Sequence, residues 1–219
     1  MKKRIKKILP VGTGFFVAKN GVALAAAHCL PDKSKLEGKE LCAGVSWGRK
    51  VRPCQVAAST VVGGLDIAII KVKTPQQVRY LPLSFQALRP GTDVLAVGIP
   101  DHGVWGNGRE IRVLKGYITY GKGSRLALSF SIPKGMSGSP LFVGEKVAGV
   151  LSGSLRSEEL EDRVEEVVEE SDREKVTRTI EVRAVVTYGL TEEIYPLRDF
   201  QHEVSRGQKF SEFLDHLNA

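Results

Sequence analysis

The chain has 219 residues, and 42% of them are hydrophobic, which is enough for a sizeable core and excludes wholesale disorder. Its 23 Gly and 10 Pro indicate many turns rather than a helical bundle, and no apolar run approaches the roughly 18 residues that a membrane-spanning helix needs. The net charge of +7 is unevenly spread, because residues 1–55 carry twelve Lys and Arg against three Asp and Glu, whereas residues 156–182 carry five against eleven. The two regions are therefore electrostatically complementary.

The N-terminal segment has two features of a secretory signal, a basic start at residues 1–7 and three alanines at 25–27. The stretch between them contains Lys19, Asn20 and three glycines, so it lacks the apolar core of a signal peptide. We therefore expect no signal peptide and a cytoplasmic location. We interpret the basic residues 1–7 as a solvated tail and consider nucleic-acid binding unlikely, because no aromatic platform accompanies them.

Three cysteines are too few for a disulfide framework, and their odd number leaves at least one thiol free. Cys29, Cys42 and Cys54 lie near His28, but gaps of about a dozen residues do not match the usual spacing of zinc ligands. We expect no metal and no organic cofactor. Cys42 and Cys54 are each six residues from Gly48, which predicts that they are cross-strand neighbours in a hairpin.

Short apolar runs separated by turn residues predict many short strands, as in a sandwich or barrel. The first two runs flank Asn20 and Gly21, a dipeptide typical of a hairpin turn. The predicted strands are residues 15–18, 22–24, 41–47, 51–56, 66–72, 93–98, 110–119, 125–132, 141–143, 146–151 and 179–188. Near the C-terminus, residues 208–217 carry Phe210, Leu214 and other apolar residues at helical spacing, which predicts a closing helix.

Residues 156–178 form a charged insertion that interrupts the strand pattern. Leu160, Val164, Val167 and Val168 follow the spacing of an amphipathic helix. Alternatively, Ser171-Asp172 is the tip of a long β-ribbon, or the segment is a solvated charged loop. In each case the insertion leaves and returns beside residues 152–154, and we favour a mobile lid or partner-binding arm over an inert loop.

The most informative motif is Gly-Met-Ser-Gly-Ser-Pro at residues 135–140. A nucleophilic serine needs a tight turn that exposes its Oγ and directs backbone N–H groups to one point, and Gly135 and Gly138 permit such a turn around Ser137. The nucleophile elbow of α/β-hydrolases does not fit, because Ser139 stands where that motif has Gly and a strand follows. Taken alone, the motif could also be an ordinary Gly/Ser turn.

Two further motifs support the catalytic interpretation. His28 ends an apolar run, where a lone histidine would more often be a core residue. Asp66 opens a predicted buried strand, where a carboxylate is costly unless it is hydrogen-bonded, for example as a turn cap. Together with Ser137 they follow the order His, Asp, Ser at gaps of 38 and 71 residues, the chain order of the chymotrypsin group and not of α/β-hydrolases or subtilisins.

These motifs resemble those of the trypsin/chymotrypsin-like serine proteases, and most closely the bacterial HtrA (Deg) group. The resemblance covers about residues 8–154. Its segments are Gly-Thr-Gly-Phe at 12–15, Ala-Ala-His-Cys at 26–29, Asp-Ile-Ala-Ile-Ile-Lys-Val at 66–72, the stretch from Leu88 to Pro100, and Gly-Met-Ser-Gly-Ser-Pro-Leu at 135–141.

The resemblance implies an all-β fold of two Greek-key six-stranded barrels with a C-terminal α-helix. We expect a basic tail at 1–7, a first barrel at 8–85, a second barrel at 90–200 that contains the insertion 156–178, and the helix at 207–218. Unlike the HtrA relatives, the chain has no room for a PDZ domain. The cysteine that bridges to the residue after the catalytic His in secreted relatives is absent, which implies that Cys29 is a buried free thiol.

The resemblance also implies a serine endopeptidase in which His28, Asp66 and Ser137 form the catalytic triad and the N–H groups of Gly135 and Ser137 form the oxyanion hole. It places Ser131 at the base of an uncharged specificity pocket with Ser154 on its wall, and makes Ser152-Gly153-Ser154 the strand that pairs with a peptide or protein substrate. Where secreted trypsins carry an Asp that pairs with a freed N-terminus, this chain has Met136, so we expect no zymogen processing. The alternative is a catalytically silent, protease-like peptide-binding module.

Overall fold

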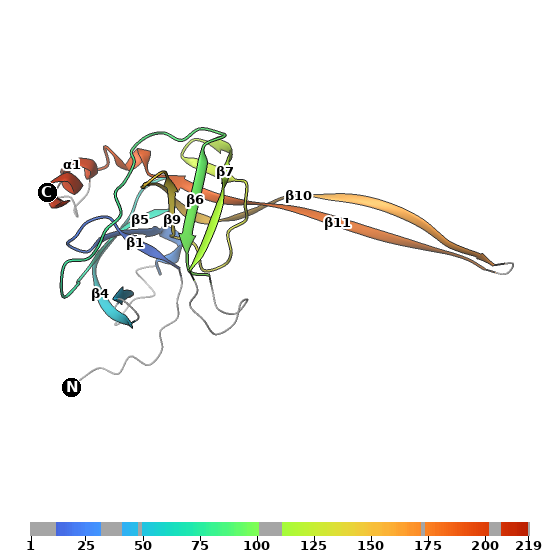
Figure 1. The fold of residues 1–219 in the computed structure, drawn as a ribbon, viewed down its shortest axis with the longest axis horizontal. Coiled ribbons are helices and arrows are strands. Elements are labelled where there is room, and N and C mark those ends of the chain that lie inside the picture. Colours follow the sequence, from blue (N-terminus) through green and yellow to red (C-terminus); the bar gives the residue numbers. More distant parts are fainter. Residues whose placement is uncertain are drawn as a thin grey trace.

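Figure 1 shows the fold in a computed structural model. The described residues are 12–31, 41–47, 50–100, 111–171, 174–201 and 207–218, and at 47, 50, 155–171 and 174–187 only the backbone is described. The basic tail at 1–7, and with it the question of nucleic-acid binding, lies outside these ranges. No helix in the described part is long and apolar enough to span a bilayer.

The first half of the chain forms a curled five-stranded antiparallel sheet in the order β1-β2-β5-β4-β3. Its strands are β1 (Gly14–Phe16), β2 (Val22–Ala26), β3 (Cys42–Trp47), β4 (Lys50–Val61) and β5 (Ile67–Val72). Gly21 has a φ of 88°, a left-handed conformation that allows the predicted turn between β1 and β2. The described residues therefore give a half-barrel here, and not the closed six-stranded barrel that we expected.

The second half forms a closed barrel of six strands in the order β10-β11-β8-β7-β6-β9. Its strands are β6 (Asp93–Gly98), β7 (Arg112–Lys122), β8 (Arg125–Leu128), β9 (Pro140–Val143), β10 (Lys146–Ser171) and β11 (Glu174–Glu193). The 3-10 turn η3 (Tyr195–Leu197) and the helix α1 (Phe210–Asn218) complete the chain. The predicted all-β chymotrypsin-like fold with a C-terminal helix is confirmed.

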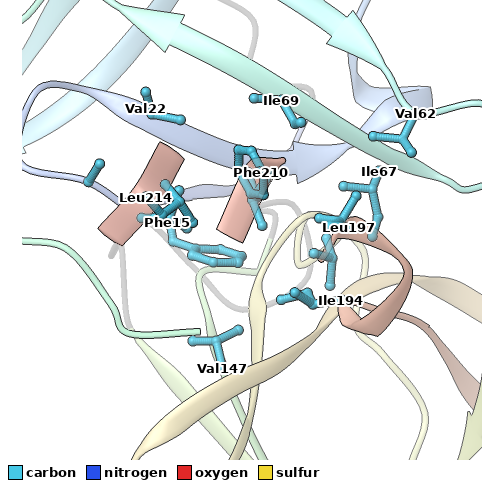
Figure 2. Close-up of a cluster of buried hydrophobic side chains, with 14 residues drawn as sticks. Phe15, Val22, Val62, Ile67, Ile69, Val147, Ile194, Leu197, Phe210 and Leu214 are labelled. Atoms are coloured by element: carbon cyan, nitrogen blue, oxygen red, sulfur yellow. The ribbon is translucent and has the colours of Figure 1, made fainter. Parts of the chain in front are cut away.

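The largest apolar core joins the two halves and the helix (Figure 2). Phe15 and Ile67 from the first sheet pack with Val147 and Ile194 from the second, and Phe210 of α1 is buried among them. Since each buried side chain of this size contributes about 1.5–3 kcal/mol, this shared core holds the two sheets against each other. The loops that carry His28, Asp66 and Ser137 connect strands of these two sheets.

Beyond the barrel, β10 and β11 continue as a two-stranded ribbon that projects far from the body of the molecule (Figure 1). The pairing runs to Ser171 opposite Glu174, so the ribbon interpretation with its tip near Ser171-Asp172 is right and the helix interpretation is wrong. The spacing of four residues suggested a helix, but residues four apart also lie on the same side of a strand. Leu160 lies opposite Ala184 and Val164 opposite Ile180 in the ribbon register.

The β3–β4 hairpin corrects the predicted pairing of two cysteines. Cys42 lies opposite Gln55, and Cys54 lies opposite Ala43, because Trp47 and not Ser46 is the partner of Lys50. A shift of one residue places neighbouring positions on opposite faces. Cys42 is accordingly exposed and Cys54 buried, and both are free thiols.

Candidate active site

His28 and Asp66 are brought together by the register of the first sheet. Ala26, the last residue of β2, lies opposite Ile67, the first residue of β5, so the residues just beyond these ends meet. His28 lies on the 3-10 turn η1 (Ala27–Cys29), and Asp66 Oδ2 is 2.6 Å from its Nδ1. The backbone N–H of His28 donates to Asp66 Oδ1 at 2.9 Å. Both carboxylate oxygens are thus engaged, which fixes the imidazole ring with Nε2 facing away from the carboxylate.

Ser137 lies on the loop that precedes β9, between two glycines with left-handed backbones. Gly135 has a φ of 92° and Gly138 a φ of 86°, conformations that a residue with a Cβ adopts only at a cost. A Cβ on Gly138 would also collide with the carbonyl oxygen of Thr13. The motif around Ser137 is therefore a tight turn pressed against the first sheet.

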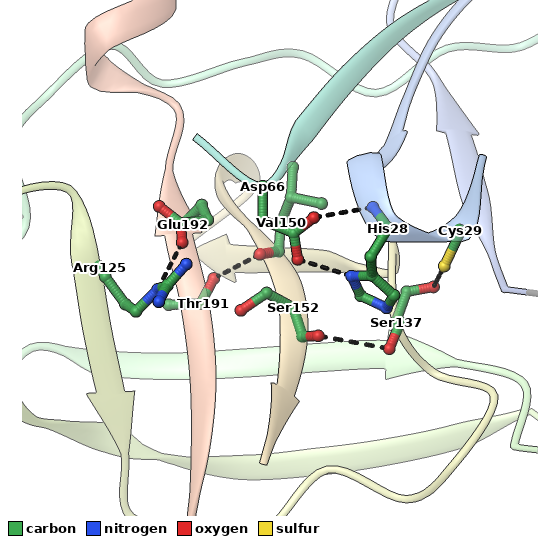
Figure 3. Close-up of polar contacts among 9 residues, drawn as sticks. All are labelled: His28, Cys29, Asp66, Arg125, Ser137, Val150, Ser152, Thr191 and Glu192. Atoms are coloured by element: carbon green, nitrogen blue, oxygen red, sulfur yellow. Dashed lines mark hydrogen bonds and ion pairs between the residues drawn. The ribbon is translucent and has the colours of Figure 1, made fainter. Parts of the chain in front are cut away.

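Figure 3 shows the His28 ring between the Asp66 carboxylate and Ser137. The Ser137 hydroxyl donates to the carbonyl oxygen of Ser152 at 3.5 Å, and no hydrogen bond to His28 is present among the described residues. Contacts of this kind are often long in ligand-free enzymes and tighten when substrate binds.

The N–H groups of Gly135 and Ser137 have no acceptor among the hydrogen bonds of the described residues. Their neighbours in the turn are bonded: Met136 N–H donates to Pro133 O at 3.2 Å, and Gly138 N–H to Leu151 O at 2.7 Å. Two unused donors beside a serine hydroxyl are the arrangement that stabilises an oxyanion.

Two residues that we expected at the specificity pocket, Ser131 and Ser154, lie next to Ile132 in the structure. Ser131 is exposed, and the Ser154 hydroxyl binds the backbone of its neighbour Ile132, accepting from the N–H at 2.9 Å and donating to the carbonyl at 3.1 Å. A Cβ on Gly189, which pairs with Ser154, would collide with Ile132. Ile132 and Gly189 therefore adjoin the expected pocket residues, and only the position of Ile132 next to Ser131 could have pointed to either of them in the sequence.

Cys29 lies on the same turn as His28 and is buried beneath the loop of Ser137. Its Sγ is 3.9 Å from the carbonyl oxygen of Ser137. Burial, and secondarily the charge of Asp66, raises the pKa of the Cys29 thiol, so it stays protonated and unreactive. The expectation of a buried free thiol here is confirmed.

The end of β11 makes polar contacts that the sequence did not predict. Glu192 is 1% exposed and binds Arg125 Nε at 2.7 Å (Figure 3). Thr191 Oγ1 donates to the carbonyl oxygen of Val150 at 3.0 Å, which ties β11 to β10 just before Ser152. No group of three His, Cys, Asp or Glu in the described ranges could hold a metal ion.

Two packed β sheets, with a His-Asp pair from the first and a serine turn from the second, define a protein of the chymotrypsin-like class. A family comparison agrees, since residues 12–150 match the trypsin-like peptidase domain. The chain belongs to the trypsin-like peptidase family.

A solved structure with a similar fold is mouse neuropsin, a serine protease expressed in the limbic system of the brain. The TM-score is 0.56 at 14% sequence identity, over 85% of each chain, a likeness of fold alone. A comparison with curated protein sequences gave no match.

Proposed function

We propose that the protein is a serine endopeptidase whose triad is His28, Asp66 and Ser137. The observation that carries the proposal is the pair of hydrogen bonds that His28 donates to the carboxylate of Asp66, next to a tight serine turn with two unused N–H donors. Membership of the trypsin-like peptidase family supports peptides as substrates.

In the proposed first step, Ser137 Oγ turns from Ser152 toward His28 Nε2, gives up its proton and attacks the peptide carbonyl. Asp66 holds the imidazole tautomer that carries its proton on Nδ1 and stabilises the imidazolium that forms. The N–H groups of Gly135 and Ser137 bind the oxyanion of the tetrahedral intermediate. His28 then protonates the leaving amine, and the acyl group remains on Ser137.

In the second step, water replaces the leaving amine, and His28 removes its proton as it attacks the acyl carbon. Collapse of this second tetrahedral intermediate releases the carboxylic acid and returns the proton to Ser137. The residues 152–154 lie next to Ser137, and we propose that their backbone pairs with an extended substrate as an added strand. The chemistry requires no metal or organic cofactor.

We further propose that the site forms without zymogen processing. Met136 is fully buried in the apolar core of the second barrel, so the residue before Ser137 has no charge that could form an ion pair with a freed N-terminus. An N-terminal extension should therefore leave kcat/KM unchanged, and a large rise after removal of the extension would contradict this part of the proposal.

The proposal is tested by labelling with a fluorophosphonate and by cleavage of a random peptide library. Ser137→Ala should abolish labelling and lower turnover by about 10⁶-fold, and Asp66→Asn should lower it by about 10⁴-fold because it favours the wrong tautomer. Ser139→Ala is the matched control, since this serine lies in the same turn but is fully buried, and its hydroxyl has no hydrogen-bond partner in the part of the chain that the structure describes. A folded wild type that binds peptides but is neither labelled nor active would indicate the silent binding module instead.

A further inference from the structure

Thr13, the residue before β1, makes two hydrogen bonds to the turn that carries Ser137. Its backbone N–H donates to the carbonyl oxygen of Ser137 at 2.8 Å. Its side-chain Oγ1 donates to the carbonyl oxygen of Gly135 at 3.0 Å, across 122 residues of sequence. A single residue at the start of the first sheet therefore bonds to both residues whose N–H groups are unused.

The second of these bonds acts on the peptide unit between Gly135 and Met136. The carbonyl end of that unit accepts from Thr13 Oγ1, and its N–H end donates to the carbonyl oxygen of Pro133. This unit lies between the two peptide units that carry the N–H groups of Gly135 and Ser137. Because both its ends are anchored, it cannot rotate without breaking a hydrogen bond, and a rotation would change the backbone angles that direct both donors.

A glycine at 135 makes such an anchor necessary. Gly135 has no Cβ to restrict its backbone, and with a φ of 92° it is in a region that glycine leaves easily. The side chain of Met136 anchors the turn from the barrel side by apolar packing only. Apolar packing is non-directional, so the orientation of this peptide unit depends on its two hydrogen bonds, and the one at its carbonyl end comes from the hydroxyl of Thr13.

We propose that Thr13 is a positioning residue that keeps the oxyanion-binding N–H groups of Gly135 and Ser137 aligned. In secreted relatives, an ion pair with a freed N-terminus orders the turn around the nucleophile. Here the hydrogen bond from the Thr13 hydroxyl would order that turn without proteolysis. This inference rests on the proposed function for its kinetic consequence, whereas its structural consequence can be measured in the protein without substrate.

The test compares Thr13→Val, which keeps the shape and the backbone hydrogen bond but loses the hydroxyl, with Thr13→Ser, which keeps the hydroxyl. Thr119→Val is the matched control, because Thr119 Oγ1 also donates to a backbone carbonyl, that of Ala127 at 3.1 Å, at another place in the barrel. Thr13→Ala loses the same hydroxyl and takes the place of the valine variant if that variant does not fold.

Two measurements are made on each variant. The first is kcat and KM for the best peptide from the library. The second is the amide resonances of Gly135 and Ser137 in the NMR spectrum of the free protein. We expect Thr13→Val to lower kcat by about 10- to 100-fold with little change in KM, somewhat less than the loss of an oxyanion donor itself, and to shift both amide resonances. Thr13→Ser and Thr119→Val should resemble the wild type in both measurements.

Unchanged kcat and unchanged amide resonances in Thr13→Val would overturn the inference and leave the proposed function standing. Equal losses in Thr13→Val and Thr13→Ser would also overturn it, because the hydroxyl would then not be responsible. If the wild type proves inactive, the proposed function fails, and the amide resonances alone decide the inference: a shift in Thr13→Val but not in Thr13→Ser supports it, and no shift overturns it.

Discussion

The Oε1 atom of Glu193 accepts a hydrogen bond from the backbone N–H of Leu88 at 2.6 Å, and so joins the end of β11 to the segment between the two sheets. Glu193 is only 6% exposed. Burial raises the pKa of its carboxyl group, and the hydrogen bond from Leu88 opposes this in part. The molecule therefore keeps a buried acid whose charged form is disfavoured.

We expect Glu193→Gln to stabilise the protein at neutral pH. A raised pKa in the folded state means that wild-type stability is fully present below the unfolded pKa of about 4.3 and falls as pH rises through the folded pKa. Glutamine keeps the oxygen that Leu88 needs and cannot ionise. Thermal denaturation should show a Tm about 2–4 °C above the wild type at neutral pH, with the difference vanishing in acid.

Glu192→Gln is the control, since it weakens the ion pair with Arg125 and should lower Tm at neutral pH. A Glu193→Gln variant that is less stable at every pH would contradict the prediction.

Cleavage should be favoured after an uncharged residue. Ser131 and Ser154 are the residues that we expect at the specificity pocket, with Ile132 beside them, and none is acidic, so a Lys or Arg there would have no counter-ion from them. Ile132→Ala should shift the preference toward larger apolar residues, because each methylene-sized difference in fit is worth about 1–3 kcal/mol. The peptide library measures both effects, and strong cleavage after Lys or Arg alone would refute the first.

Removal of the ribbon should change kinetics more than stability. Replacing residues 157–186 by Asn-Gly joins Arg156 to its partner Thr187 through a hairpin turn and keeps the pairs from Gly149 to Arg156. The outer part of β10, residues 156–171, has eight acidic residues against two basic ones. We expect kcat/KM for peptides with basic flanks to fall severalfold at about 50 mM salt and to equal the wild type at about 500 mM. Peptides with acidic flanks are the control, and identical kinetics at all salt concentrations would leave the ribbon without a role in substrate attraction.

Thiol counting in denaturant should give three. Cys42 and Cys54 occupy offset positions on opposite faces of their hairpin, and Cys29 is buried under the serine turn. Three free thiols would support our proposal of a cytoplasmic location, since reducing compartments keep thiols free. A count of one would mean that two cysteines pair after a rearrangement of the hairpin.

The sequence was sufficient for the fold class and for the pairing of His28 with Asp66, because both depend on local motifs at the ends of short apolar strands, but it did not predict that the first sheet stays open. The sequence was insufficient where the same spacing of apolar residues fits both a helix and a strand. Residues four apart, such as Leu160 and Val164, fit a helix and a strand equally well, and only the partner strand decides between them.

Tertiary contacts explain the other gaps. Nothing near Cys42 indicates whether Cys42 pairs with Cys54 or with Gln55, and that shift of one residue in the register decides which face each cysteine occupies. Thr13 belongs to a motif that resembles the family, but its hydroxyl bonds to Gly135, which is 122 residues away in the sequence. Contacts of that separation depend on the packing of two sheets and leave no periodicity in the sequence.

The strand β10 runs without interruption from Lys146 in the barrel to Ser171 at the tip of the ribbon. At about 3.3 Å per residue, the tip lies about 60 Å from Ser152. A partner held at that tip is confined to a sphere of this radius around the nucleophile, which corresponds to a local concentration on the order of 1 mM. Because β10 and β11 stay paired out to the tip, such a partner would be tied to the barrel by two strands and not by a single linker chain, and it would always approach the nucleophile from the side on which the ribbon leaves the barrel.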